Sequence, residues 1–281
     1  MSETGQDPDF TPGRARKALG QHFLFDPDIL RRAALAAGPV EGRTVIEVGP
    51  GPGGLTRAIL NEGADKLIVV EADQRFADGL KAWPEATSGR LHIHQADARK
   101  VDMAALIAEA GGQQPAMIVA NLPYNVGTPL VVDWIKSGGW RGEMALMFQK
   151  EVAERLAAKP GTHHYGRLAV LAHSVCDVHI AFTLPPGAFR PPPKVDSAVA
   201  VLRPLPPEER FDDVASLEKV AAAAFGQRRK MLRASLKSFA KTKGIDATEW
   251  LESCGIDPTA RAETLTQAEF RKLAMAFAKA D

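Results

Sequence analysis

The apolar residues of this chain gather in short runs that polar and glycine-rich stretches separate. Continuous runs of strand length are typical of strands buried on both faces, alternation as in residues 91–95 also indicates a strand, and amphipathic repeats between the strands indicate helices. The predicted strands are residues 44–48, 66–71, 91–95, 116–119, 143–148, 179–184 and 198–202. The predicted helices are residues 27–37, 55–61, 74–83, 103–110, 129–137, 151–158 and 167–176, with residues 20–24 as a loop leading into the first of them. This alternation predicts an α/β fold, a parallel sheet with helices on both faces.

The last third of the chain carries no strand signal beyond the linker-like sequence Arg-Pro-Leu-Pro-Pro at residues 203–207. Residues 220–241 show two helical stripes, one apolar and one basic. The apolar stripe is Phe225, Leu232, Leu236 and Phe239, and the basic stripe is Arg229, Arg233, Lys237 and Lys241. We therefore expect a disordered tail (residues 1–16), an α/β domain (residues 17–205) and a small all-helical domain (residues 206–281).

Composition narrows the class of protein. The chain has 281 residues, of which 45% are hydrophobic and 25% charged, as in a soluble globular protein. Its polar, acidic first residues lack the apolar region of a signal peptide, and no run is long enough to span a membrane, so a cytoplasmic location is expected. The two cysteines, Cys176 and Cys254, belong to no disulfide or zinc motif, so no metal is expected.

Candidate ligand-binding residues lie at the ends of three successive predicted strands. The first runs into a glycine-rich turn in which Gly49, Gly51 and Gly54 formally match the dinucleotide fingerprint, which enzymes using nicotinamide or adenosylmethionine share. Glu71 ends the next strand, about twenty residues later, the spacing that places a carboxylate on ribose hydroxyls. Asp97 follows the third strand, where a carboxylate can accept from the amine of a bound adenine.

The next predicted strand, residues 116–119, leads into Asn121-Leu122-Pro123-Tyr124. The Asn121 amide oxygen can accept from an amino group, Pro123 stiffens the turn, and Tyr124 offers a flat face on which a base can stack. Such a loop after a strand is typical of methyltransferases that act on amino groups of bases, although Asn-x-Pro is also ordinary turn chemistry. The proline-rich segment of residues 189–197 begins with Phe189, which we expect to form a second aromatic face opposite Tyr124.

Any nucleic-acid binding must come from a local basic patch rather than from the overall charge, because the net charge is +1. No acidic residue interrupts the sequence between Phe225 and Lys243, so a phosphate-binding surface is expected there. Its candidate residues are Arg228, Arg229, Lys230, Arg233 and Lys237.

Taken together, these motifs resemble those of the adenosylmethionine-dependent ribosomal RNA adenine dimethyltransferases. The segment of residues 19–24 is similar to the family's Leu-Gly-Gln-Asn-Phe-Leu, with His22 in place of the asparagine, and residues 189–197 are similar to Phe-x-Pro-x-Pro-Lys-Val-x-Ser. Residues 225–230 are similar to Phe-Asn-Gln-Arg-Arg-Lys, which favours the small-subunit enzymes over the large-subunit resistance methylases.

The resemblance implies a Rossmann-like class I methyltransferase domain that uses S-adenosylmethionine. In it, His22 and Leu24 would border the cofactor. Gly49 would approach its methionine part, Glu71 its ribose and Asp97 its adenine, while Asn121 would lie between cofactor and target base. The implied reaction is N6,N6-dimethylation of two adjacent adenines near the 3′ end of small-subunit rRNA, by a monomer acting on a pre-assembled subunit during ribosome biogenesis.

Three alternatives remain open at this point. The glycine fingerprint also suits a dinucleotide-dependent oxidoreductase. The same fold and basic patch would suit an RNA-binding assembly factor without catalysis. Within the enzymes, the acceptor could instead be large-subunit rRNA or the adenine N6 of DNA.

Overall fold

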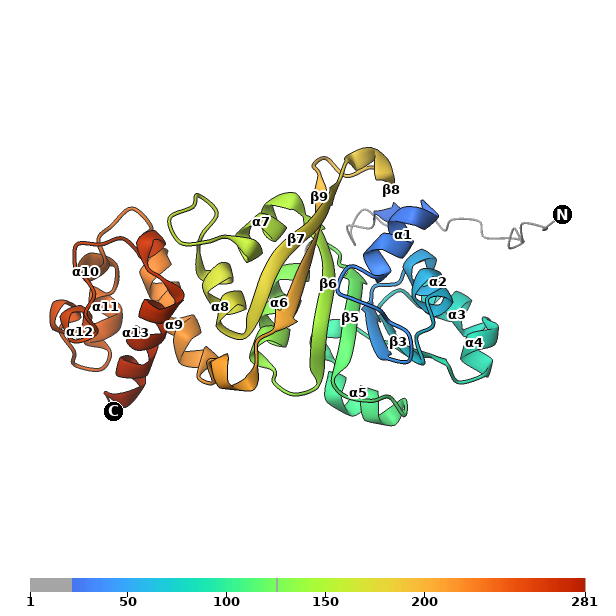
Figure 1. The fold of residues 1–281 in the computed structure, drawn as a ribbon, viewed down its shortest axis with the longest axis horizontal. Helices are drawn as coiled ribbons and strands as arrows, with labels where there is room; N and C mark the ends of the chain where they lie inside the picture. Colours follow the sequence, from blue (N-terminus) through green and yellow to red (C-terminus); the bar gives the residue numbers. More distant parts are fainter. Residues whose placement is uncertain (1–21, 125, 281) are drawn as a thin grey trace.

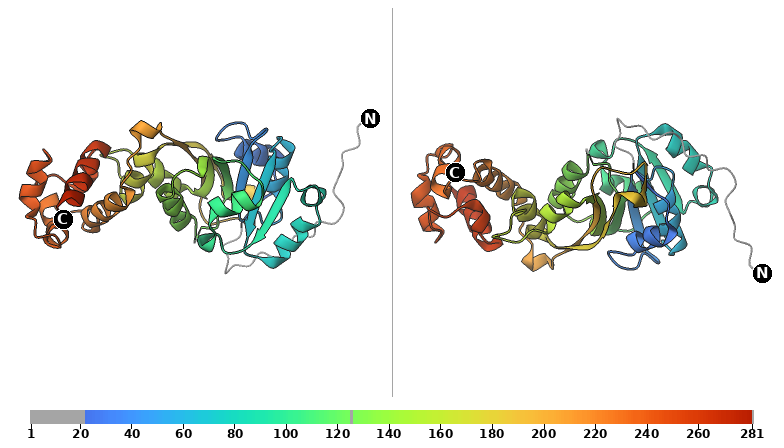
Figure 2. Two further views of the ribbon diagram at one scale, coloured as in Figure 1. Left: turned by 90° about the horizontal axis from the view of Figure 1, so that it is seen from below. Right: turned by 90° about the horizontal axis from the view of Figure 1, so that it is seen from above.

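A computed structural model describes residues 22–124 and 126–280 of the chain. The predicted tail, residues 1–16, and the first part of the 19–24 motif lie outside these residues. Figures 1 and 2 show an elongated molecule in which a layered α/β body carries a helical unit at one end.

The body is built on one seven-stranded sheet with the order β4-β3-β2-β5-β6-β9-β7. Its strands are β2 (Thr44–Val48), β3 (Lys66–Glu71), β4 (Leu91–Gln95), β5 (Ala116–Asn121), β6 (Arg141–Gln149), β7 (Cys176–Leu184) and β9 (Ser197–Pro204). All predicted strands are present, but the prediction of a wholly parallel sheet is wrong, because β9 pairs antiparallel with both β6 and β7. The connection from β7 to β9 contains no α-helix that could return the chain for parallel pairing.

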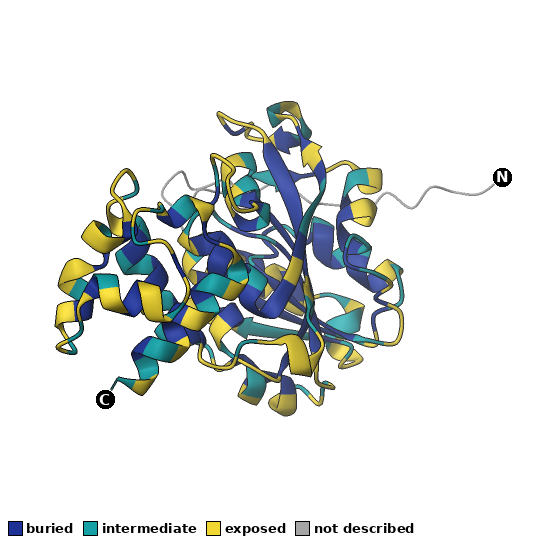
Figure 3. Cartoon of the chain, turned by 60° about the vertical axis from the view of Figure 1, so that its left-hand side comes forward, coloured by how far each residue is buried: buried dark blue, intermediate teal, exposed yellow. Residues whose placement is uncertain are grey.

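Helices cover both faces of the sheet because successive strand residues point to opposite sides. Val45 and Met117 belong to one buried cluster, and their neighbours Ile46 and Ile118 belong to the other. Figure 3 shows the strands as a buried layer between partly exposed helices. The helices of the body are α1 (Pro27–Ala34), α2 (Gly54–Asn61), α3 (Gln74–Lys81), α4 (Pro84–Thr87), α5 (Met103–Glu109), α6 (Gly127–Lys136), α7 (Lys150–Ala157) and α8 (Arg167–Val175).

The helix predicted over residues 74–83 ends two residues earlier than predicted, and a short helix that was not predicted follows it. Helix α3 ends at Lys81, and α4 begins at Pro84 after Trp83 takes an extended conformation (φ −75°, ψ 146°). The pyrrolidine ring of a proline disfavours helical geometry in the preceding residue, which explains the break at Trp83.

A small ribbon outside the main sheet was not predicted. Residues Phe23–Leu24, predicted to be part of a loop, form β1, which pairs antiparallel with β8 (Phe189–Arg190). The pairing joins the amino-terminal motif to the start of the proline-rich segment, and both segments are near the carboxyl end of the sheet.

The helical unit consists of α9 (Val214–Gly226), α10 (Leu232–Ser235), α11 (Lys237–Lys241), α12 (Ala247–Ser253) and α13 (Gln267–Lys279). The helical stripes predicted over residues 220–241 are interrupted, because Gln227 leaves helical geometry (φ −130°, ψ 64°) and Met231 is extended and bridges to Arg261. The fourfold spacing of the basic residues therefore does not define one helical face. The apolar residues of the predicted stripe still pack into the core.

The helical unit is continuous with the body rather than loosely tethered. One buried cluster contains side chains of the sheet, of α6 and α8, and of α9 and α13. Polar contacts add to it: the Tyr165 hydroxyl donates to the Leu265 carbonyl at 3.0 Å, and the Gln267 amide donates to the Val170 carbonyl at 2.8 Å. No helix in the described parts of the chain has the length and apolar character needed to cross a membrane.

Candidate active site

A cavity of about 230 Å³ opens at the carboxyl ends of the parallel strands β2 to β5. This edge of an open α/β sheet is where ligands generally bind. The cavity brings together eight of the predicted site residues: His22, Gly49, Glu71, Asp97, Asn121, Leu122, Pro123 and Tyr124. Leu24 and Phe189 do not line it. Phe23 and Arg99 do, and neither was predicted.

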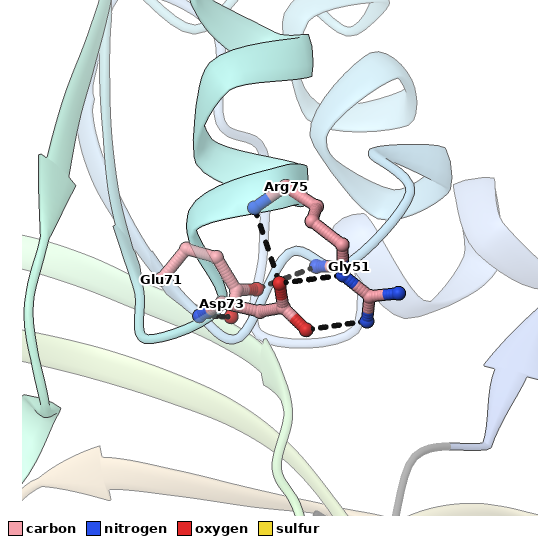
Figure 4. Close-up of polar contacts among 4 residues, drawn as sticks. All are labelled: Gly51, Glu71, Asp73 and Arg75. Atoms are coloured by element: carbon pink, nitrogen blue, oxygen red, sulfur yellow. Dashed lines mark hydrogen bonds and ion pairs between the residues drawn. The ribbon is translucent and has the colours of Figure 1, made fainter. Parts of the chain in front are cut away.

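Glu71 closes the glycine-rich turn from the neighbouring strand. One of its carboxylate oxygens accepts the backbone N–H of Gly51 at 3.0 Å, and the other accepts that of Asp73 at 2.8 Å. Figure 4 shows these contacts and the adjacent pair of Asp73 with Arg75. Burial raises the pKa of Glu71, which is 5% exposed, while the two N–H donors act in the opposite direction. Each oxygen keeps a second lone pair with which to accept a ligand hydroxyl.

The glycine-rich turn approaches the cavity too closely for larger residues. Gly51 has a φ of +53°, and a Cβ atom there would lie 2.6 Å from a ring carbon of Phe23. Glycine is therefore required at this position by both backbone conformation and space. In the sequence, Phe23 lies between His22 and Leu24, which were both predicted to border the cofactor. The sequence did not show that the Phe23 ring covers the glycine-rich turn.

Asp97 is held by a side chain that the sequence analysis missed. The guanidinium of Arg99 donates to one carboxylate oxygen from Nε at 3.0 Å and to the other from Nη2 at 2.6 Å. These bonds and the backbone N–H of Arg99 lower the pKa of Asp97 to about 2. The carboxylate therefore stays ionised at neutral pH and remains an acceptor at the rim of the cavity.

Asn121 is oriented by the amino-terminal segment. Its Nδ2 donates to the backbone carbonyl of His22 at 3.0 Å, which leaves the side-chain oxygen available as an acceptor. The Tyr124 hydroxyl shares a hydrogen bond of 2.6 Å with the hydroxyl of the buried Ser197, and burial raises the pKa of Tyr124. The imidazole of His22 stacks on the Tyr124 ring, with the centroids 5.4 Å apart and the planes 30° apart.

The position of Phe189 does not match the predicted second aromatic face. Phe189 is 2% exposed, and it pairs with Leu24 between β8 and β1, so that both side chains enter the same buried cluster. Phe189 therefore does not face Tyr124 in this structure, and the ring that stacks on Tyr124 is that of His22. The β1–β8 ribbon is the physical reason, since it turns Leu24 and Phe189 together into the core.

The predicted phosphate-binding residues fall into two groups. Arg229, Lys230, Arg233 and Lys237 are exposed. Arg228 instead donates from Nε to the Glu263 carboxylate at 2.9 Å and from Nη2 to the His163 carbonyl at 2.7 Å. It therefore ties the α9–α10 turn to the loop before α8, and its charge is largely satisfied within the protein.

A second carboxyl group, Glu47 in β2, lies beneath the turn. It is 1% exposed, accepts from the Thr56 hydroxyl at 2.7 Å, and has its pKa raised by burial from 4.5 to about 8. The folded protein thus keeps a proton that the unfolded chain releases above pH 4.5. This contribution to stability is complete below that pH and is lost as the pH rises through about 8.

We therefore expect Glu47→Gln to reduce the loss of stability between pH 5 and pH 8. The glutamine oxygen can still accept from Thr56, but the side chain no longer titrates. Urea unfolding of the wild type and the variant at pH 5, 6.5 and 8 measures the two slopes, and all other titrating groups are common to both proteins. Identical pH dependence in the two proteins would show that Glu47 is already ionised when folded.

No group of three His, Cys, Asp or Glu side chains that could hold a metal ion occurs among residues 22–124 and 126–280. The site offers hydrogen-bond acceptors, an aromatic face and a close backbone turn.

Comparisons with known proteins agree with this arrangement. A family model described as ribosomal RNA adenine dimethylase matches residues 13–279. A protein of Agrobacterium fabrum named ribosomal RNA small subunit methyltransferase A is 52% identical over 264 residues, covering 92% of each chain. A protein of the same name from Caulobacter vibrioides is 50% identical over 263 residues, covering 93% of this chain and 97% of the relative.

Solved structures show the same fold. A dimethyladenosine transferase from Plasmodium falciparum has a TM-score of 0.76 at 26% identity, covering 92% of this chain and 98% of that one. The 23S rRNA methyltransferase ErmE has a TM-score of 0.66 at 22% identity, covering 92% of this chain and all of that one. The body has the Rossmann-like α/β fold of class I methyltransferases, followed by a helical part. With its fold, its cavity and a family match over nearly its whole length, the chain belongs to the ribosomal RNA adenine dimethylase family.

Proposed function

We propose that this protein transfers methyl groups from S-adenosylmethionine to the exocyclic N6 of two adjacent adenines near the 3′ end of small-subunit rRNA. The product is N6,N6-dimethyladenosine. The observation that carries the proposal is the orientation of Asn121 at the end of β5. Its amide nitrogen is bound to the His22 carbonyl, so its oxygen is available beside Tyr124, within the cavity that also contains Glu71 and Asp97.

The residues of the cavity fit S-adenosylmethionine. Glu71 offers acceptors for ribose hydroxyls, Asp97 offers an acceptor for the adenine amine, and the turn at Gly51 admits no Cβ. When bound, this group supplies an electrophilic methyl group on a sulfonium. The charge state of Asp97 suits its role, since a pKa of about 2 keeps it an acceptor at every physiological pH.

The acceptor amine needs help from the protein because its lone pair is delocalised into the adenine ring. We propose that the Asn121 side-chain oxygen and the Leu122 carbonyl accept its two hydrogens, which favours a pyramidal nitrogen with an available lone pair. The target adenine must leave its stack, and Tyr124 supplies the face that receives it. Rate enhancement then comes mainly from positioning and electrostatics rather than from a strong base.

RNA affinity is assigned to the exposed cations of the helical unit: Arg229, Lys230, Arg233 and Lys237. A local patch is needed because the chain as a whole has a net charge of +1. The continuous core between the helical unit and the body holds this patch at a set distance from the cavity. We propose that the protein acts as a cytoplasmic monomer on a pre-assembled small subunit, in which the adenines and a second RNA site are held apart.

Two adjacent arginines provide a matched test of this surface. Arg229→Ala is expected to weaken RNA binding and to reduce the slope of log affinity against log salt by about one, with stability unchanged. Arg228→Ala is expected to lower the free energy of unfolding by about 1 kcal/mol, because it breaks contacts with Glu263 and His163, and to change the salt slope less. Salt titrations of RNA binding and urea unfolding measure both effects. Equal salt slopes for the two variants would contradict the assignment.

The function is tested by transfer of labelled methyl groups to small ribosomal subunits from cells that lack the modification, followed by digestion to nucleosides. Dimethyladenosine in small-subunit rRNA is the expected product. Monomethyladenosine alone would contradict dimethylation. Preferred transfer to large-subunit rRNA or to DNA would show that this other nucleic acid is the substrate. Cofactor binding without transfer to any nucleic acid would favour an assembly factor.

A further inference from the structure

The contact between His22 and Tyr124 has a consequence for substrate entry. The two rings are stacked at 5.4 Å between centroids, which is direct contact for offset aromatic planes. No base fits between rings at this separation, because an inserted ring would need a full van der Waals thickness on each side. A base that stacks on this face of Tyr124 must therefore take the place of the imidazole.

His22 is held from three directions. Its Nδ1 donates to the Pro191 carbonyl at 2.7 Å, since a carbonyl oxygen can only accept. Its own carbonyl accepts from Asn121 Nδ2 at 3.0 Å, and its ring lies on Tyr124. The side chain and the backbone of this one residue thus contact different partners, so the ring can leave Tyr124 while the carbonyl still orients Asn121.

We propose that the His22 side chain is a place-holder for the target base. In the free protein the imidazole covers the face of Tyr124 that receives adenine under the proposed function, on which this inference rests. Its edge is anchored on the proline-rich segment at Pro191, and the half-buried ring leaves by a side-chain rotation that gives up this hydrogen bond. The arriving base replaces one aromatic contact of Tyr124 with another, so Tyr124 is never left uncovered.

The place-holder lowers apparent RNA affinity, because the base must compete with the imidazole. An aromatic pair of this kind changes an equilibrium constant about two- to tenfold. A side chain without a ring should therefore allow easier entry, and a more strongly stacking ring should make entry harder. A purely structural role would make both substitutions harmful in the same direction.

The test uses the matched pair His22→Ala and His22→Phe in the full-length protein, with steady-state methylation of unmodified small subunits as the readout. We expect His22→Ala to lower the KM for subunits about two- to tenfold and His22→Phe to raise it, with the affinity for S-adenosylmethionine, measured by calorimetry, changed less. The ring of phenylalanine stacks on Tyr124 but cannot bond to Pro191, so it separates stacking from anchoring. A KM that moves in the same direction in both variants, or in neither, would overturn the proposal.

The Tyr124→Ala variant separates failure of this inference from failure of the proposed function. If Tyr124→Ala leaves methylation intact, the target base does not depend on stacking against Tyr124, and the place-holder proposal is refuted as well. If Tyr124→Ala impairs methylation, the result supports stacking of the target base on Tyr124. His22→Ala should then have no effect on KM in the Tyr124→Ala background, and a persisting effect would refute the place-holder alone.

Discussion

Replacing Asn121 with alanine is expected to reduce methyl transfer about 100- to 1,000-fold, the loss that typically follows removal of one pre-oriented polar group at a reacting centre. The residue lies at the end of β5 with its amide nitrogen bound to the His22 carbonyl at 3.0 Å, so the variant loses the acceptor oxygen and its orientation together. Affinity for S-adenosylmethionine should stay within a few-fold, because Glu71 and Asp97 are assigned to that task.

Single-turnover methylation and calorimetric cofactor binding measure the two quantities separately. Asn121→Asp is an informative companion, since it keeps an oxygen but places a carboxylate against the His22 carbonyl, and we expect it to lose activity as well. Asn61→Ala, at the exposed end of α2, is the matched control and should be neutral. Full activity in Asn121→Ala would remove the hydrogen bond to the amine from the mechanism.

Replacing Glu71 with glutamine is expected to weaken cofactor binding at least about 100-fold, because hydrogen bonds to a charged partner contribute about 1.5–3 kcal/mol each. Each carboxylate oxygen already accepts a backbone N–H, from Gly51 and from Asp73. In glutamine one of these oxygens becomes an NH2 group, which then faces another donor. The turn is disturbed, and an acceptor for the ribose is lost.

Calorimetry with S-adenosylmethionine measures this loss, and filter binding of RNA without cofactor should show little change. Glu109→Gln, on the exposed side of α5, is the matched control for charge and side-chain size. If Glu71→Gln bound cofactor as tightly as the wild type, the carboxylate would have only a structural role in closing the turn.

The site residues that lie at the end of a strand, or directly after it, were predictable from the sequence. The strands β2, β3 and β5 are continuous apolar runs and β4 alternates, so their ends are visible in the sequence, and the carboxyl ends of β2 to β5 meet at one edge of the sheet. Glu71, Asp97 and Asn121 could therefore be placed in one site without coordinates. The resemblance to a known family added His22 and the expected cofactor, S-adenosylmethionine.

Contacts between distant segments were not predictable in this way. The β1–β8 ribbon moves Leu24 and Phe189 into the core and leaves His22 over Tyr124. In the turn between Gly226 and Met231, Arg228 bonds to Glu263 while its neighbour Arg229 is exposed. Two adjacent arginines look alike in a charge pattern, and partners far away in the sequence, Glu263 and the His163 carbonyl, distinguish them.

The sequence by itself determined which segments form the sheet, which turn approaches a ligand and which side chains end the central strands, because hydrophobic periodicity and glycine conformation are local properties. The tertiary structure alone decided the antiparallel strand β9, the ring that covers Tyr124, the bond that orients Asn121 and the division of the basic residues. Each of these depends on pairing across many residues, and such pairing is set by packing in space rather than by neighbours along the chain.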